Sequence, residues 1–143
     1  MTTAVYTATA TSWGGRTGKV VTSDDKIAMD LSIPAEMGGD GGAGTNPEQL
    51  FASGWAACFH SAVKMIARSQ KLDVTDSAVT LSVGVIPGEG GGFDFDVKIE
   101  VQIPGADRVA AQAVVDAAHQ VCPYSRATRG NLPVAITLIT EED

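Results

Sequence analysis

The stretch Asn46–Gln70, NPEQLFASGWAACFHSAVKMIARSQ, decides the fold. Asn46 is typical of a helix N-cap, Pro47 suits the first helical position, and Gln49 completes a capping-box pattern. The sequence therefore predicts one helix of about 37 Å, at 1.5 Å per residue. Its middle is apolar or small on nearly every face, so it must be covered on all sides. A tight homodimer that buries this helix is the economical explanation.

Alternating apolar and polar residues on both sides of this helix predict short strands. Three strands come first, a hairpin with the turn GEGGG follows the helix, and a second helix precedes the last strand. The expected elements are strands at 4–11, 18–23, 26–32, 78–87, 92–104 and 132–140 and a second helix at 106–121. The order βββ-α-ββ-α-β predicts an α+β fold, and the absence of a repeat or linker predicts a single domain over residues 1–143.

Composition narrows the class of protein. Hydrophobic residues make up 44% and charged residues 19% of the chain, which excludes a disordered or membrane-spanning chain. The net charge of -7 opposes binding to nucleic acid and to anionic membrane surfaces. The N-terminus lacks the basic head and apolar run of a signal peptide, so we expect a cytoplasmic protein. In such a compartment two cysteines are free thiols, metal ligands or a redox pair rather than a structural staple.

Cys58 lies in the middle of the long helix, on an apolar stripe. Helical spacing aligns it with Phe51, Trp55, Ala62 and Met65. This pattern is typical of a small core residue, and it favours that interpretation over a reactive thiol. An apolar setting disfavours the thiolate, and three helical turns separate Cys58 from the start of the helix dipole. If Cys58 reacts, its activating cation must come from elsewhere in the chain.

The other Cys and His residues allow two further hypotheses. The chain has two cysteines and two histidines, but Cys58 and His60 point to nearly opposite sides of a helix, which disfavours a zinc site. Cys122 follows the second helix in VCPYSRATRGN and precedes Pro123. This position is either an ordinary helix exit or the start of a short helical piece, in which the nearby Arg126 and Arg129 would stabilise a thiolate.

Long motifs around both cysteines resemble those of a known family. TNPEQLFASGWAACF and VCPYSRATRGN, together with GGRTGKV and GEGGGFDFDVKI, resemble the organic hydroperoxide resistance (Ohr) branch of the Ohr/OsmC family. The resemblance extends over essentially the whole chain. It implies an intertwined homodimer in which the long helix is buried against curved antiparallel sheets, with an active site at the subunit interface. An OsmC-branch protein is the alternative within the family.

The resemblance also implies a reaction and its residues. The peroxidatic cysteine corresponds to Cys58, the resolving cysteine to Cys122, the activating arginine to Arg16 and its glutamate partner to Glu48. The expected function is a thiol peroxidase that reduces organic hydroperoxides, including fatty-acid hydroperoxides, through a Cys58–Cys122 disulfide. The expected reductant is dihydrolipoamide or a lipoylated protein, and no metal or other cofactor is expected. Two positions depart from the family pattern, because Arg126 replaces a common asparagine and Trp55 a frequent tyrosine.

These roles are physically reasonable. Arg16 would supply the cation that the apolar setting of Cys58 lacks, and Glu48 would pair with it bidentately. A substrate pocket with Phe51, Trp55 and Met65 would favour apolar peroxides. The alternatives are a redox sensor or a carrier of hydrophobic ligands that does not turn over, and a structural domain with two inert cysteines.

Helix geometry suggests where the charged pair must come from. Glu48 and Cys58 are ten residues apart, which is about 15 Å along one helix. A single arginine could hardly touch both in the same copy of the helix. We therefore hypothesise that the Arg16–Glu48 pair that serves a given Cys58 includes residues of the partner subunit.

Overall fold

The computed structural model describes residues 2–141. These residues form two compact units, one that extends to Leu50 and one that begins at Phe51. The boundary falls within the first turn of the long helix. The single-domain organisation over residues 1–143 stays a prediction.

The N-terminal unit contains an antiparallel sheet with the order β1-β2-β3. Its strands are β1 (Ala10–Trp13), β2 (Lys19–Thr22) and β3 (Ala28–Asp30). Two short 3-10 turns, η1 (Gly15–Thr17) and η2 (Ala35–Met37), lie in the connections before β2 and after β3. The sheet thus provides the first three strands of the predicted order.

The long helix α1 spans Pro47–Gln70. Asn46 caps it as predicted, because the side-chain oxygen of Asn46 accepts a hydrogen bond of 2.8 Å from the Gln49 N–H. At the other end Lys71 adopts a left-handed conformation with φ 58°, and the Leu72 N–H donates to the Ala67 carbonyl at 2.9 Å. This arrangement closes the last helical turn.

The C-terminal unit contains a second three-stranded sheet, with the order β4-β5-β6. Strands β4 (Ala78–Pro87) and β5 (Phe93–Gln102) form the predicted antiparallel hairpin. Strand β6 (Val134–Ile139) pairs with β5 in parallel, so this sheet is mixed. The expected antiparallel pairing thus holds for β4 and β5, and the edge strand β6 departs from it. The chain between β5 and β6 forms two helices, and a crossover of that length returns it to the same end of the sheet.

Two helices connect β5 to β6. Helix α2 (Arg108–Val121) begins after Asp107, whose carboxylate accepts a hydrogen bond of 3.0 Å from the Ala110 N–H. The short helix α3 (Pro123–Thr128) follows Cys122 directly. This is the short helical piece that the sequence allowed.

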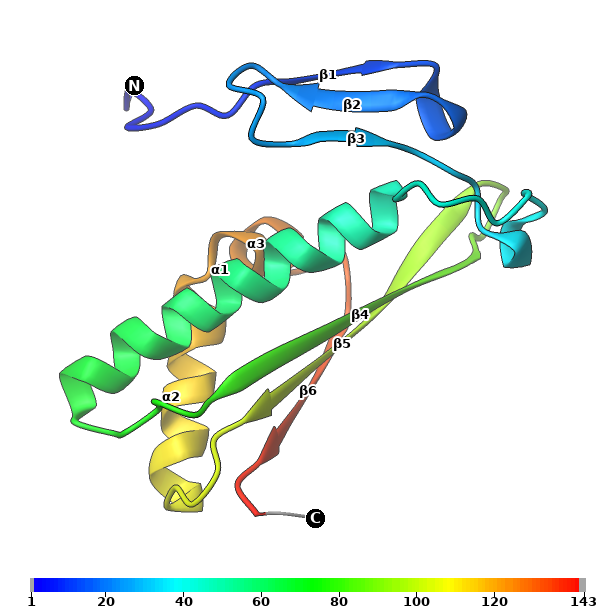
Figure 1. The fold of residues 1–143 in the computed structure, drawn as a ribbon. Coiled ribbons are helices and arrows are strands. Elements are labelled where there is room, and N and C mark those ends of the chain that lie inside the picture. The colour runs from blue at the N-terminus through cyan, green and yellow to red at the C-terminus, as the bar shows by residue number, and fades with distance from the viewer. Residues whose placement is uncertain (1, 142–143) are drawn as a thin grey trace. The chain divides into compact units, whose positions relative to one another are not determined.

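Helices α1 and α2 lie on the same side of the β4-β5-β6 sheet (Figure 1). Alternate residues of β5 face them, as expected for a sheet with one buried face. The fully buried core side chains of this unit include Trp55, Phe59, Val63, Val97, Ile99, Val101, Ile103, Val114, Val115 and Cys122. Cys122, the cysteine of the VCPYSRATRGN motif, is therefore part of the core.

The predicted element order is confirmed, with one clear shift of a boundary. Strand β1 begins at Ala10 rather than at residue 4. Its register pairs Ala10 with Thr22, the last residue of β2. The Ser23 N–H still donates to the Thr9 carbonyl at 2.9 Å, but residues 2–9 extend beyond the end of β2 and form no strand. Within residues 2–141, no helix combines the length and hydropathy that a membrane span requires.

Replacing one buried and one exposed phenylalanine tests the core described above. Phe59 is fully buried, whereas the Phe93 side chain is 73% exposed. We expect Phe59→Ala to lower the free energy of unfolding by about 3–5 kcal/mol, because it removes a large buried side chain and leaves a cavity. The matched control Phe93→Ala should change it by less than about 0.5 kcal/mol. Urea denaturation followed by circular dichroism measures both values, and equal losses would contradict the core described here.

Candidate functional site

Arg16 is presented by a tight glycine turn between β1 and β2. It lies in η1, and the Gly18 N–H closes the turn on the Gly15 carbonyl at 3.1 Å. A Cβ atom at Gly18 would lie 1.7 Å from the Trp13 carbonyl oxygen, so only glycine allows the two strands to approach this closely. The glycines of the motif GGRTG thus serve the turn that carries the arginine.

Arg16 and Glu48 form the bidentate pair that the resemblance implies. The distances are 2.9 Å from Nη1 to Oε2 and 2.6 Å from Nη2 to Oε1. The Glu48 side chain is 11% exposed and that of Arg16 38% exposed. The hydrogen bonds from Arg16 lower the pKa of the Glu48 carboxyl, and those same bonds raise the pKa of Arg16. Both groups are therefore fully charged near neutral pH, and the guanidinium has a fixed orientation.

Cys58 and Cys122 come together in the C-terminal unit. Cys58 packs against the core cluster that contains Cys122, and both the Cys122 side chain and the Tyr124 backbone N–H are close enough to affect the pKa of the Cys58 thiol. Both thiols are free, with Cys58 half-buried on α1 and Cys122 fully buried. Sixty-four residues separate them in the sequence, so the fold creates this contact.

A break between two helices places Cys122 there. Its N–H still donates to the Ala118 carbonyl at 2.9 Å, as the last bond of α2. Its ψ of 124° is extended, which Pro123 requires of the residue before it. Its carbonyl then accepts from the Arg126 N–H at 2.9 Å and starts α3. Cys122 is thus shared by two helix ends, and its side chain turns into the core.

The local environment opposes ionisation of Cys58. Burial raises the pKa of its thiol, and the adjacent Cys122 raises this pKa further, through charge repulsion and hydrogen bonding. The Tyr124 N–H lowers the pKa of Cys58, but its effect is smaller than that of burial. This agrees with the expectation that Cys58, if it reacts, needs a cation from elsewhere in the chain.

Two arginines lie near Cys122 in the sequence, and the structure places them differently. Arg129 Nη2 donates to the His119 carbonyl at 2.5 Å, which fixes the end of α2. Arg126 is exposed on α3. Arg129 therefore stabilises the chain conformation at the break between α2 and α3.

Four aromatic side chains of the C-terminal unit form a cluster. Phe51 lies with its ring centroid 5.5 Å from Trp55, 5.4 Å from Phe95 and 6.0 Å from Tyr124. Trp55 stacks on Tyr124 at 5.9 Å with an interplanar angle of 17°. Phe51 and Trp55 belong to the predicted pocket. Phe95 and Tyr124 were missed, because they come from β5 and α3, although Tyr124 lies in the CPYS motif itself.

Met65 does not belong with these residues. Its side chain is 56% exposed, whereas Trp55, Phe59, Ala62, Val63 and Ala67 form the buried face of α1. Successive residues of a helix are rotated by about 100° around its axis. On this basis the centre of the buried face lies past Trp55, in the direction away from Met65. The predicted stripe therefore ran along one edge of the buried face. Cys58 lies on that edge and Met65 outside it.

The histidines take no part in the thiol contact. His60 Nε2 lies 2.9 Å from Ser77 Oγ, and the ring of His119 packs against Phe59 with 6.5 Å between centroids. Within the described part of the chain, no three His, Cys, Asp or Glu side chains are arranged to hold a metal ion.

The fold and the two adjacent thiols define an α+β dithiol protein, and comparison with known proteins gives its family. The profile of the OsmC-like protein family matches residues 38–137. The organic hydroperoxide resistance protein of Xanthomonas axonopodis pv. citri (strain 306) is 51% identical over 137 residues, which is 94% of each chain. The chain belongs to the OsmC-like family, in its organic hydroperoxide resistance branch.

Solved structures agree with this assignment. An organic hydroperoxide resistance protein OsmC from Legionella pneumophila superposes with a TM-score of 0.91 at 43% identity, covering 96% of this chain and all of that one. The organic hydroperoxide resistance protein OhrB of Bacillus subtilis gives a TM-score of 0.84 at 41% identity, over 94% and 99% of the two chains. The α+β fold predicted from the sequence is thus that of known crystal structures.

The contact between the thiols predicts their oxidation product. We expect a mild thiol oxidant such as diamide to convert Cys58 and Cys122 into an intrachain disulfide, because two neighbouring thiols need only a small movement to bond. Peptide mapping by mass spectrometry after blocking of free thiols measures the linkage. Cys122→Ser is the control, in which no intrachain bond can form. A product linked only between chains would contradict this geometry.

Proposed function

We propose that this protein is a thiol peroxidase that reduces organic hydroperoxides, including fatty-acid hydroperoxides, to alcohols. The single observation that carries the proposal is the contact between the half-buried Cys58 and the buried Cys122. The names of the similar proteins agree with it, since they are called organic hydroperoxide resistance proteins. The alternative of two inert structural thiols would not require them to meet.

The proposed cycle uses both sulfurs. The Cys58 thiolate attacks the distal peroxide oxygen, the O–O bond breaks, and the alkoxide leaves as an alcohol after it takes up a proton. Cys58 is then a sulfenic acid. The Cys122 sulfur attacks it, the S–O bond breaks, and water leaves as the Cys58–Cys122 disulfide forms. Two electrons have moved from the thiols to the peroxide.

An external dithiol closes the cycle. Its thiolate attacks the disulfide, and a second exchange step releases the two protein thiols and the oxidised reductant. Dihydrolipoamide or a lipoylated protein is the proposed reductant. We propose that the reaction proceeds in the cytoplasm. It needs no metal or other cofactor in this proposal, because the cysteines supply both electrons.

Arg16 has the role of thiolate stabiliser in this proposal. Burial raises the pKa of Cys58, and a guanidinium fixed by Glu48 is the kind of cation that offsets this effect. Ten helical residues, about 15 Å, separate Glu48 from Cys58 along α1. We propose that a homodimer supplies the charged pair of one subunit to the thiol of the other, at an active site between the two chains.

The substrate pocket is proposed at the aromatic cluster. Phe51 and Trp55 on α1 are joined there by Phe95 on β5 and Tyr124 on α3. Tyr124 is also the residue whose N–H touches the Cys58 sulfur. An apolar group held against these rings would lie beside the reacting thiol, which favours alkyl hydroperoxides over hydrogen peroxide.

Peroxide consumption tests the proposal. We expect the wild-type protein to reduce a fatty-acid hydroperoxide through many turnovers with dihydrolipoamide, and hydrogen peroxide more slowly. Cys58→Ser should abolish the reaction. Cys122→Ser should reduce about one equivalent of peroxide and then stop with this reductant, because the disulfide cannot form. A wild-type protein that is oxidised once and never recycled by any dithiol would indicate a redox sensor instead.

Thiol alkylation tests the role of Arg16. Only the thiolate is alkylated, so the rate of labelling of Cys58 by iodoacetamide rises as pH passes through the pKa of that thiol. A nearby guanidinium favours the charged form, so its removal should raise this pKa by about one unit or more. We therefore expect the midpoint of the pH profile of Arg16→Ala to lie above that of the wild type.

Two variants make this measurement specific to the charged pair. Glu48→Gln retains a hydrogen-bond acceptor for Arg16 and should shift the midpoint less than Arg16→Ala. Cys122→Ser as a common background restricts labelling to Cys58. Coincident profiles for wild type and Arg16→Ala would sink the proposed role, whatever the effect on turnover.

A further inference from the structure

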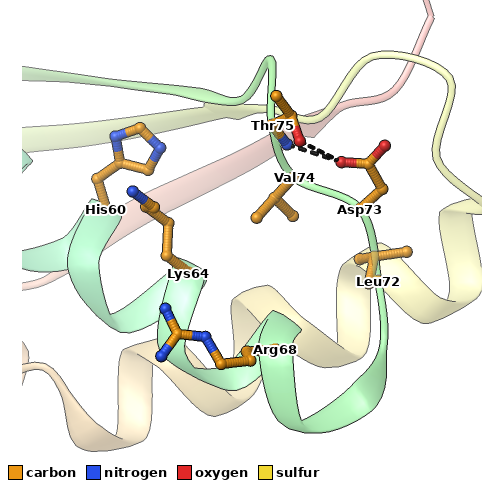
Figure 2. Close-up of a pocket in the computed structure, with 7 residues that line it drawn as sticks. All are labelled: His60, Lys64, Arg68, Leu72, Asp73, Val74 and Thr75. Carbon is orange, nitrogen blue, oxygen red and sulfur yellow. Dashed lines mark hydrogen bonds between the residues drawn. The ribbon is translucent and has the colours of Figure 1, made fainter.

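A cleft lies beside the C-terminal half of α1, on a different face of this helix from Cys58. Its volume is about 410 Å³, within the range of about 300–1,000 Å³ that is typical of small-molecule sites. His60, Lys64 and Arg68 line one side, at a spacing of four residues along one helix face (Figure 2). Leu72 and Val74, from the segment after the helix, line the other. Asp73 and Thr75, from the same segment, complete the lining, so two cations, one carboxylate and two apolar side chains face the same space.

The positive charge of this cleft is unusual for the chain. The protein has seventeen acidic and ten basic residues, but residues 49–72 contain Lys64, Arg68 and Lys71 and no acidic residue. Within residues 2–141, the one recorded ion pair is Arg16–Glu48. Within this described range, Lys64 and Arg68 thus form no ion pair, although the carboxylate of Asp73 also lines the cleft.

The helix dipole explains only part of this cluster. Basic residues in the last turn of a helix interact favourably with its C-terminus, and the effect falls off beyond that turn. Arg68 and Lys71 satisfy this condition, since α1 ends at Gln70. Lys64 lies almost two turns before that end, so the dipole gives no reason for its charge.

His60 can add to the same site. The Ser77 hydroxyl donates to the Val74 carbonyl at 2.6 Å, so Ser77 Oγ must accept the hydrogen bond from His60 Nε2 at 2.9 Å. The Nε2 proton is thereby fixed, and Nδ1 carries no proton in the neutral ring. Burial and the charge of Lys64 lower the pKa of His60, so the ring contributes an ordered polar wall rather than a permanent charge.

We propose that this cleft binds a small organic anion, with its carboxylate or phosphate group between Lys64 and Arg68 and a short apolar group against Leu72 and Val74. A carboxylate and a phosphate share the oxyanion chemistry that both cations recognise. The site makes no use of Cys58 or Arg16, so it does not depend on the peroxidase proposal.

Asp73 provides a sharp test, because its charge and its structural role can be separated. Its Oδ1 atom accepts from the Thr75 N–H at 2.9 Å and from the Thr75 hydroxyl at 2.7 Å (Figure 2). An asparagine retains this oxygen and loses the negative charge at the rim of the cleft. Asp73→Asn should therefore keep the turn and strengthen anion binding by about twofold to fivefold.

Titration of the two histidines by NMR measures binding directly. The probes are hexanoate, hexyl phosphate and inorganic phosphate, with hexylammonium as a control of opposite charge. We expect the ring signals of His60 to shift saturably with the hexyl anions, with dissociation constants of about 1 mM or below. The ring signals of His119, which lies outside the cleft, should not move. A stronger response to one hexyl anion would identify the preferred head group.

Matched charge removals assign the contact. Lys64→Gln and Arg68→Gln should each weaken binding by about threefold to tenfold. Lys71→Gln removes the same charge at the helix end outside the cleft lining and should change it by less than about twofold. Linear, non-saturating shifts, equal weakening in all three variants, or equal binding of hexylammonium would overturn the proposal. Unchanged unfolding curves confirm that each variant is folded.

Discussion

The contact between the Cys58 and Cys122 sulfurs is the interaction on which the rest of the site depends. Cys58 is held on a long helix that is anchored in the core, whereas Cys122 occupies the one residue between α2 and α3. Pro123 prevents α2 from continuing and forces its predecessor into an extended conformation. The chain therefore changes direction at Cys122, and the end of α2 and the start of α3 fix its conformation there.

This contact has an electrostatic cost. Burial is the largest of the effects that raise the pKa of the Cys58 thiol, and the neighbouring Cys122 raises it further. A site that relies on a thiolate must add positive charge without adding water. The Arg16–Glu48 pair has the required properties, because the carboxylate fixes both guanidinium nitrogens and leaves the group cationic. The pair lies in the N-terminal unit and the thiols in the C-terminal unit.

Local sequence patterns predicted the elements well and their partners less well. The cap at Asn46 and the hairpin of β4 and β5 follow from short-range rules, and both are present. The parallel pairing of β6 with β5 depends on which sheet edge the chain reaches after two helices, and no local pattern encodes that choice. The limit of β1 at Ala10 similarly depends on where its partner strand ends.

The same distinction applies to the candidate site. The family resemblance of long motifs assigned Cys58, Cys122, Arg16 and Glu48 to the site, and the pairing of Arg16 with Glu48 that it implied is present. Periodicity alone placed Met65 in the pocket, because a stripe drawn through Cys58 follows one edge of a buried face that is centred elsewhere. Phe95 and Tyr124 could not be assigned by spacing along α1, since tertiary packing brings them there from other elements.

Gly54 shows how the thiol contact constrains the helix that carries it. Glycine in the middle of a helix costs about 1 kcal/mol relative to alanine, so helix propensity does not account for it. A Cβ atom at this position would lie 2.5 Å from the hydroxyl oxygen of Tyr124. The missing side chain lets the ring of Tyr124 lie against α1 and stack on Trp55. Because the N–H of the same Tyr124 is close enough to lower the pKa of Cys58, a residue that weakens α1 locally helps to bring α3, and with it Cys122, against the face of the helix that carries Cys58.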